Sequence, residues 1–482
     1  MFSIVLLSIF LIGMVIIGFW GMKKTVTLND FFLGGRSIGP WISAVAYGTT
    51  YFSAVMFIGF AGKIGWGFGL DCLWVAAGNA FVGSLAAWLI LGKRTRRMTQ
   101  KLNVMTMPEF LHERFEGVHL KIFAATIIFL FLLPYSASVF KGLSHLFEAN
   151  FNMPYDVALL IMIGITGVYL ILGGYFAVTL TDFIQGIIMI GGSITMVLVL
   201  VAQGGGFHQV VQNVVTNYPQ HIPAAHHPSG FMLFALFFIT SFGVWGMPQM
   251  VQKFYSIKSE KFIFKAAIVS TVFAVIITFS AYFVGAISHA FLSSPPMVNG
   301  VPVIDRLIPQ LLTTYLPGWL MAVILLLVLS ASMSTLSSLI LVSASAVAID
   351  LYKGHVNPTI SKERSLLMMR FLSGIFIVLS YFIARYEFSV IVTLMSLSWG
   401  VIAGAFMAPY VYGLFWKRTT KRGVQAGMVT GVFLAIFLFY KWGPTNAPIA
   451  SMFAMVVPFI VVPVVSLMTK PPSQDRLEKA FS

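Results

Sequence analysis

The chain alternates between long apolar segments and short polar connections over almost its whole length. Thirteen of the apolar segments are long enough to cross roughly 30 Å of hydrocarbon as helices. The pattern therefore predicts an all-α integral membrane protein with about thirteen transmembrane helices. The predicted segments are 2–21, 38–61, 70–91, 122–147, 155–173, 178–202, 230–249, 264–292, 316–351, 366–384, 388–416, 424–442 and 449–468.

The composition agrees with a membrane protein. Hydrophobic residues make up 58% of the 482 residues and charged residues 9%, against roughly 25% charged in soluble domains. Helices satisfy their own backbone hydrogen bonds, so such a chain is stable in lipid. No basic residue and no small-residue cleavage site marks the first segment as a removable signal, so we expect a retained helix. The single cysteine, Cys72, excludes an intrachain disulfide.

The basic residues predict the orientation in the membrane. Of 30 Lys and Arg residues, 25 fall on one set of alternate connections. The positive-inside rule then places the N-terminus outside and the C-terminus in the cytoplasm of a cell-membrane protein. Because the net charge of +15 is scattered over short connections, a nucleic-acid partner is not expected. The five basic residues on the opposite side are Lys63, Lys141, Arg306, Arg385 and Lys441.

Motifs of soluble enzymes are missing. No phosphate-binding Walker loop or HExxH zinc motif occurs, and the glycines of Gly65–Gly69 follow no strand. The chain is therefore not expected to be an enzyme or an ATP-driven pump. A transporter that is coupled to an ion gradient, of protons or of another ion, or that is passive is the favoured class. A solute sensor is less favoured, because no long signalling extension follows the last helix.

Four histidines lie in the connection 204–228, which contains no Lys or Arg. Their spacing matches no common zinc pattern, and solvated side chains are the favoured interpretation over a metal site. The histidines are His208, His221, His226 and His227.

Asp182 is the acidic residue that the pattern places deepest, near the start of the sixth segment. An intramembrane carboxylate indicates function by default, because its burial is costly. A first-turn acid facing the helix dipole is the equally weighted alternative.

The middle of the ninth segment is rich in hydroxyl groups, over Leu329–Ser338. Ser334, Ser337 and Ser338 share one helix face, with Thr335 at its border. Small residues of this kind also allow close helix packing. Neutral oxygens nevertheless suit a monovalent cation.

Two segments carry signs of interrupted helices. The second places Gly48 beside polar residues, and the seventh contains Gly243, Gly246 and Pro248. The two segments lie five apart, and a repeated unit of five crossings must be inverted in the membrane. This arrangement is typical of secondary transporters, whose sites lie between broken helices.

Three stretches resemble signatures of the sodium:solute symporter family, and they occur in the family's order. They are Asp30–Pro40, Gly173–Gly186 and Ala331–Ser338. The resemblance implies a five-plus-five inverted-repeat core over 38–416, with repeats at about 38–202 and 230–416. It adds an N-terminal helix in 1–37 and two C-terminal helices in 417–482.

The resemblance also implies a sodium site between the second and ninth segments. It would consist of backbone carbonyls of Thr49, Phe52 and Ala331 and the hydroxyls of Ser334 and Thr335. Some members bind a second sodium, at positions that Asp182, Ser337 and Ser338 match here. Sodium would be co-transported, and no organic cofactor is implied.

The substrate pocket resembles the pantothenate and monocarboxylate branches more than the proline branch. Tyr51 stands where proline-transporting relatives have an acid, and Thr240 and Val244 replace aromatic residues. A small organic acid is therefore favoured, and an amino acid such as proline is the alternative. The expected partners are this solute, sodium and the bilayer, with a monomer as the simplest assembly. The candidate pocket residues are Tyr51, Ser53, Tyr135, Thr240, Trp245 and Ser398.

Overall fold

The computed structural model describes residues 2–24, 32–172, 175–223, 227–386 and 389–481. Four residues of the sequence signatures, Asp30, Phe31, Gly173 and Gly174, lie outside this part, as does His226. The described chain is almost entirely helical, as predicted. Its two named strands, β1 (Met297–Val298) and β2 (Val301–Pro302), form one short antiparallel hairpin.

The helices of the described chain differ in their ability to span a membrane. Ten of them are long and apolar enough to cross, or eleven if one bent pair counts as a single span. The helix at 155–172 contains only a shorter apolar stretch, Tyr155–Gly164, and the segment predicted at 38–61 is divided by a break. The count of thirteen therefore stays a prediction.

The first half of the bundle follows a peripheral helix, α1 (Phe2–Lys24), and ends at residue 203. Its elements are α3 (Pro40–Tyr51), η2 (Val55–Phe60), α4 (Ala61–Phe68), α5 (Leu73–Gly78), η4 (Asn79–Gly92), α6 (Lys93–Lys101), α7 (Met107–Phe115), α8 (Val118–Phe151), α9 (Tyr155–Leu172) and α10 (Tyr175–Gln203).

The second half follows α11 (Phe207–His221) and runs to residue 415, after which the chain ends in four further helices. The elements of this half are α12 (Gly230–Phe242), α13 (Pro248–Ser256), α14 (Ile263–Phe291), α15 (Leu307–Tyr315), α16 (Gly318–Ser345), η9 (Ala346–Val356), α17 (Lys362–Arg385) and α18 (Ile391–Phe415). The last four are α19 (Lys421–Trp442), α20 (Ala447–Val456), α21 (Pro458–Met468) and α22 (Gln474–Phe481).

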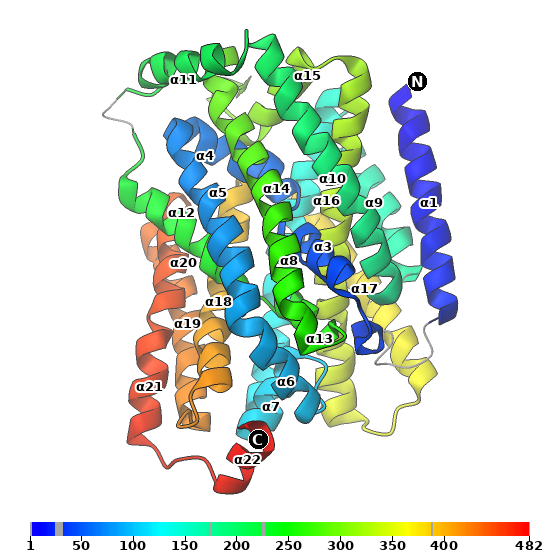
Figure 1. The fold of residues 1–482 in the computed structure, drawn as a ribbon, viewed down its shortest axis with the longest axis vertical. Helices are drawn as coiled ribbons and strands as arrows, with labels where there is room; N and C mark the ends of the chain where they lie inside the picture. Colours follow the sequence, from blue (N-terminus) through cyan, green and yellow to red (C-terminus); the bar gives the residue numbers. More distant parts are fainter. Residues whose placement is uncertain (1, 25–31, 173–174, 224–226, 387–388, 482) are drawn as a thin grey trace.

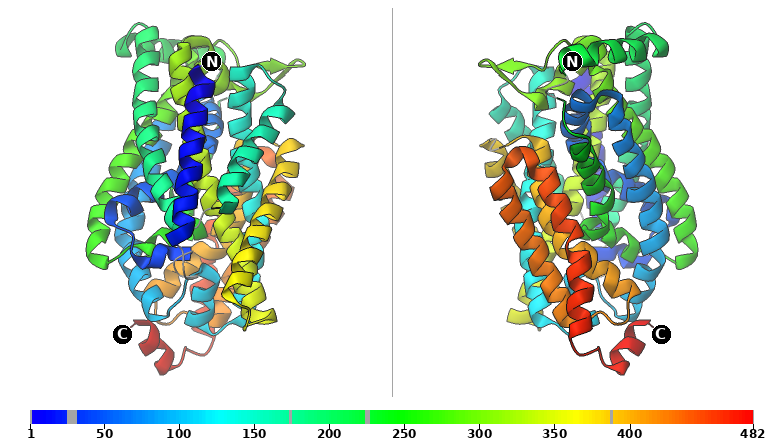
Figure 2. Two further views of the ribbon diagram at one scale, coloured as in Figure 1. Left: turned by 90° about the vertical axis from the view of Figure 1, so that its right-hand side faces the viewer. Right: turned by 90° about the vertical axis from the view of Figure 1, so that its left-hand side faces the viewer.

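The two halves pack reciprocally, as expected for an inverted-repeat transporter core. Helix α10, the last helix of the first half, packs along α16 in the middle of the second half. In the same way, α18, the last helix of the second half, packs along α8 in the middle of the first half. The two chain ends lie at opposite ends of the bundle (Figure 1). Helix α1 and the pair α19 and α21 cover opposite sides of it (Figure 2). The exact limits of the three predicted parts remain a prediction.

The centre of the bundle is formed by α16 and α18. The spans that contain them are each 94% buried within the protein, whereas the span in α1 is 22% buried. The hydroxyl-rich stretch of α16 therefore faces protein on every side rather than lipid. Such an environment is where intramembrane polar groups are found.

Both predicted helix interruptions are present, but the first is displaced. Helix α3 ends at Tyr51, and Phe52 has extended backbone angles of φ −107° and ψ 107°. The unwound stretch lies four residues after Gly48, at Phe52, and Gly48 itself is helical. A Cβ atom there would lie 2.3 Å from the ring of Phe273, so this glycine serves close packing against α14. In the second interruption, α12 and α13 meet at a bend of 48° around the extended residue Met247.

The first signature positions the start of α3. Gly34, Gly35 and Arg36 all have positive φ angles of 56°, 62° and 55°, which glycine adopts without steric cost. The turn directs the Arg36 guanidinium to the carbonyls of Thr99 and Tyr255, each 3.3 Å away. The signature therefore ties the approach to α3 to the ends of α6 and α13.

Candidate functional site

The break in α3 and the hydroxyl cluster of α16 meet in the centre of the protein. The Ser334 hydroxyl donates to the Thr49 hydroxyl at 2.8 Å. The Thr335 hydroxyl lies 3.3 Å from the Thr49 carbonyl, 3.1 Å from the Thr50 carbonyl and 3.1 Å from the Ala331 carbonyl. All five residues are buried.

The local structure explains why these oxygens are available. The last four carbonyls of a helix have no intrahelical partner, and α3 ends at Tyr51. Hydroxyl groups in α16 face the freed carbonyls of Thr49 and Thr50. Thr50 supplies the second carbonyl that Thr335 contacts, while Phe52 is the first extended residue of the break. These oxygens are neutral hydroxyls and carbonyls, and such an arrangement is chemically suited to a monovalent cation.

Asp182 forms a buried ion pair beside this cluster. Its Oδ2 atom lies 3.3 Å from the Nζ atom of Lys253 in α13, and both side chains are fully buried. The same Nζ atom lies 3.3 Å from the Ser338 hydroxyl, which also contacts the Thr50 hydroxyl at 3.1 Å. Ser337 donates instead to the Ser334 carbonyl of its own helix at 2.9 Å. The predicted second sodium site grouped Asp182 with Ser338, but Lys253 was not predicted to lie beside them.

A small cavity lies between the two broken helices. Four of the six predicted pocket residues, Tyr51, Ser53, Tyr135 and Thr240, line it. Its volume is about 20 Å³, which is room for about one water molecule. A solute would therefore have to widen this cavity by moving the surrounding helices. The other lining residues are Phe52, Val55, Met56, Phe60, Asn79, Tyr282, Met395 and Trp399.

Asn79 organises the polar side of the cavity. Its Oδ1 atom accepts from the Tyr51 hydroxyl at 3.4 Å and from the Ser241 hydroxyl at 3.3 Å, and its Nδ2 atom donates to the Tyr282 hydroxyl at 3.4 Å. The Tyr51 hydroxyl also donates to the Thr240 carbonyl. Sequence analysis missed Asn79 and Tyr282. The signal for Asn79 was a lone amide in the apolar segment 70–91.

Two predicted pocket residues lie elsewhere in the described structure. The Trp245 indole donates to the Val82 carbonyl at 3.2 Å, and the Ser398 hydroxyl donates to the Phe131 carbonyl. Both side chains thus use their polar atoms to join neighbouring helices. Neither contributes to the wall of the cavity described above.

Asp182 is not the only carboxylate that the fold buries. Asp305 lies 3.2 Å from the Lys141 ammonium and accepts the Ile391 backbone N–H at 3.1 Å. Asp350, at the far end of the ninth segment, accepts from the Thr106 hydroxyl at 2.8 Å. These two carboxylates lie near helix ends, as the sequence indicated, but the surrounding loops and helices enclose them.

Residues 207–221 of the connection 204–228 form helix α11, which was not predicted. His221 is not simply solvated: its Nδ1 atom lies 3.0 Å from Nδ1 of His289 in α14. Both imidazoles stack on the Trp66 ring, with centroid separations of 5.6 Å and 4.0 Å. His221, His289 and Trp66 thus form a packed aromatic cluster. No group of three metal-ligating side chains occurs among the described residues.

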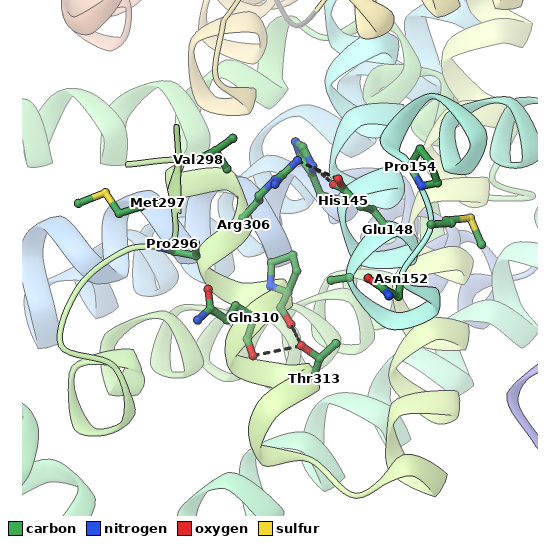
Figure 3. A pocket seen from close by; sticks show the side chains of 13 residues that line it. His145, Glu148, Asn152, Pro154, Pro296, Met297, Val298, Arg306, Gln310 and Thr313 are labelled. Atoms are coloured by element: carbon green, nitrogen blue, oxygen red, sulfur yellow. Dashed lines mark hydrogen bonds and ion pairs between the residues drawn. The ribbon is translucent and has the colours of Figure 1, made fainter. Parts of the chain in front are cut away.

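A larger cleft lies away from the broken helices. It has a volume of about 560 Å³ and lies between the end of α8, the strand hairpin and α15. Figure 3 shows that Arg306 and His145 both face Glu148, at 2.8 Å and 3.1 Å. Because Glu148 joins these charged groups to one another, the cleft is a poorer candidate for the solute site than the central cavity.

The broken helices, the buried oxygen cluster and the cavity between them define a helical membrane transporter, not an enzyme. The sequence model of the Sodium:solute symporter family matches residues 31–431. This chain belongs to the sodium:solute symporter family, and sodium is its co-transported ion.

The relatives and solved structures cover nearly the whole chain. A sodium/proline symporter of Haemophilus influenzae is 29% identical, over 99% of this chain and 98% of the relative. Sodium/proline symporter 2 of Staphylococcus saprophyticus is 30% identical, over 94% and 88%. A sodium-coupled sialic acid symporter, solved in a substrate-bound outward-open state, has a similar fold, with a TM-score of 0.82 at 18% identity over 98% and 99%.

Proposed function

We propose that this protein takes up a small organic acid, either a monocarboxylate or a pantothenate-like acid, together with sodium by alternating access. The observation that carries the proposal is the contact between α16 and the break in α3. Ser334 and Thr335 there meet the freed oxygens of Thr49 and Thr50. We propose that sodium binds among these groups, with the carbonyls of Ala331 and Phe52 completing the site.

Sodium at this position would connect two helices that must separate during transport. Binding favours the state in which α3 and α16 are close, because the ion needs ligands from both. Coupling requires this difference in affinity, since an ion that binds both states equally shifts no equilibrium. Low sodium inside the cell then allows the two helices to part and the solute to leave.

The chemistry of the cavity favours a carboxylate over an ammonium group. No acidic side chain is among the residues that line it, so no carboxylate there would pair with an ammonium group. The Tyr282 hydroxyl and the Asn79 amide supply donors, whereas the Tyr51 hydroxyl already donates to the Thr240 carbonyl. A second candidate is proline, because the curated relatives named above are proline transporters.

Flux measurements with purified protein in proteoliposomes test the proposal. Uptake of pantothenate, a short monocarboxylate and proline would be compared with an inward sodium gradient or with choline at fixed pH. Sodium-dependent uptake of an acid is expected. Uptake of proline alone would favour the second candidate, and uptake that is indifferent to sodium but driven by pH would favour proton coupling.

We also propose that the N-terminus faces the outside of the cell membrane and the C-terminus the cytoplasm. The unequal distribution of basic residues supports this orientation. Labelling of single cysteines introduced at residue 2 and residue 480, in a Cys72→Ser background, would test it in intact cells. An impermeant reagent should modify the first position and spare the second.

A further inference from the structure

We propose that the ammonium group of Lys253 permanently occupies a second cation position beside Asp182, so that each solute is accompanied by one sodium ion. This inference rests on the proposed function. It concerns the stoichiometry, which the sequence left open between one and two sodium ions because Asp182, Ser337 and Ser338 matched a second site.

The contacts of Lys253 are those that a bound cation would make. Its Nζ atom lies 3.3 Å from Asp182 Oδ2 and 3.3 Å from the Ser338 hydroxyl. Two of the three groups predicted to bind a second sodium therefore already surround a positive charge. The third, Ser337, directs its hydroxyl to the Ser334 carbonyl instead.

The charge balance excludes a further cation from this position. One carboxylate and one ammonium, both fully buried, neutralise each other. A sodium ion added beside Asp182 would lie close to the Nζ atom, in a buried region where like charges repel strongly. It would also leave a net positive charge without a partner, and such charges are costly to bury. The sodium site at Thr49 and Thr335 is built from neutral oxygens, and Asp182 contacts it through the Ser334 hydroxyl rather than as one of its ligands.

A tethered cation also explains how three moving elements stay connected. Lys253 belongs to α13 in the second broken helix, Asp182 to α10, and Ser338 to α16. A purely structural ion pair would make the same contacts but would have no effect on ion stoichiometry. The two roles are therefore separated by counting sodium ions rather than by measuring stability.

The first test uses the wild-type protein. Equilibrium binding of radioactive sodium to the purified full-length transporter should give one ion per chain. Reversal potentials in proteoliposomes should give one sodium per transported solute. Two bound ions per chain, or two sodium ions per transported solute, would overturn the inference while leaving sodium-coupled transport intact. No sodium binding at all would overturn both this inference and the proposed function.

The second test removes the tethered charge. Lys253→Met leaves Asp182 without its partner, and sodium binding should rise from one to two ions per chain, with a Hill coefficient above one. Lys253→Arg keeps the positive charge and should stay at one ion. The double variant Asp182→Asn with Lys253→Met removes both charges and should also bind one. Binding does not require turnover, so an inactive but folded Lys253→Met that binds one ion would contradict the inference.

Discussion

The Ser334 hydroxyl of α16 lies 2.8 Å from the Thr49 hydroxyl of α3, although 285 residues separate them in the chain. The contact places a side-chain oxygen of one central helix beside the freed carbonyls at the end of another. A cation held here would respond to the distance between the two helices. The relationship therefore connects the fold directly to the proposed coupling.

Replacement of Thr335 by Ala should weaken sodium binding. The variant loses one hydroxyl oxygen between the Thr49, Thr50 and Ala331 carbonyls. A loss of about 1–2 kcal/mol corresponds to roughly a 5–30-fold higher half-saturating sodium concentration. Uptake measured against sodium concentration checks this result. Thr335→Ser keeps the hydroxyl and is the control, and an unchanged sodium dependence in Thr335→Ala would remove this residue from the site.

Replacement of Asn79 by Leu should impair solute binding more than sodium binding. The variant leaves the Tyr282 hydroxyl without its partner and removes an acceptor from Tyr51. We expect about a 10-fold increase in the half-saturating solute concentration, since an unpaired buried polar group costs about 1–3 kcal/mol.

A matched control for Asn79 lies on the same helix. Ser84 contacts Ser270 at 2.7 Å and does not line the cavity. Ser84→Ala should lower thermal stability slightly and leave solute affinity unchanged. If both variants reduced solute affinity equally, the effect of Asn79 would be a general one on packing.

Replacement of Gly285 by Ala should destabilise the protein. A Cβ atom at this position would lie 2.0 Å from the Ala61 carbonyl oxygen, so α4 and α14 would have to separate. Overpacking of this kind costs about 1–3 kcal/mol. Gly191→Ala is the control, because a Cβ there meets no atom within 4 Å. Melting temperatures in detergent should fall for the first variant only.

The contact between His221 and His289 should make the end of the protein that carries α11 sensitive to acid. Partial burial lowers the pKa of His221 below its usual value of 6.5. The folded state therefore favours the neutral imidazole. The contribution of His221 to folding stability is fully present above about pH 6.5 and is lost as the pH falls towards the lower pKa of the folded state. Protonation of both rings at 3.0 Å would add repulsion.

Hydrogen exchange of α11 at pH 7.5 and at pH 5.5 measures this effect. After correction for the slower intrinsic exchange at pH 5.5, the protection factors of α11 should be lower than at pH 7.5. His221→Gln should remove most of the difference, whereas His208→Gln, an exposed change on the same helix, should not. Equal pH dependence in the two variants would show that another group is responsible.

The sequence by itself determined that this is a helical membrane protein with two interrupted helices, because long apolar segments and glycine or proline breaks act locally. It also indicated Ser334 and Thr335, since polar side chains gathered in the middle of an apolar segment favour an ion or solute site. Thr49 as a sodium ligand was implied only by the family resemblance. The helix breaks at Phe52 rather than beside Gly48. Gly48 packs closely against Phe273, and the sequence gives no sign of this contact.

Only the tertiary structure decided which polar groups share one place. Lys253 looked like an ordinary basic residue at the end of a segment, yet the bend after Gly246 turns its helix inward to Asp182. Asn79 and Tyr282 likewise reach the cavity from separate helices. Contacts between residues this far apart depend on how helices cross and bend, and hydrophobic periodicity records neither.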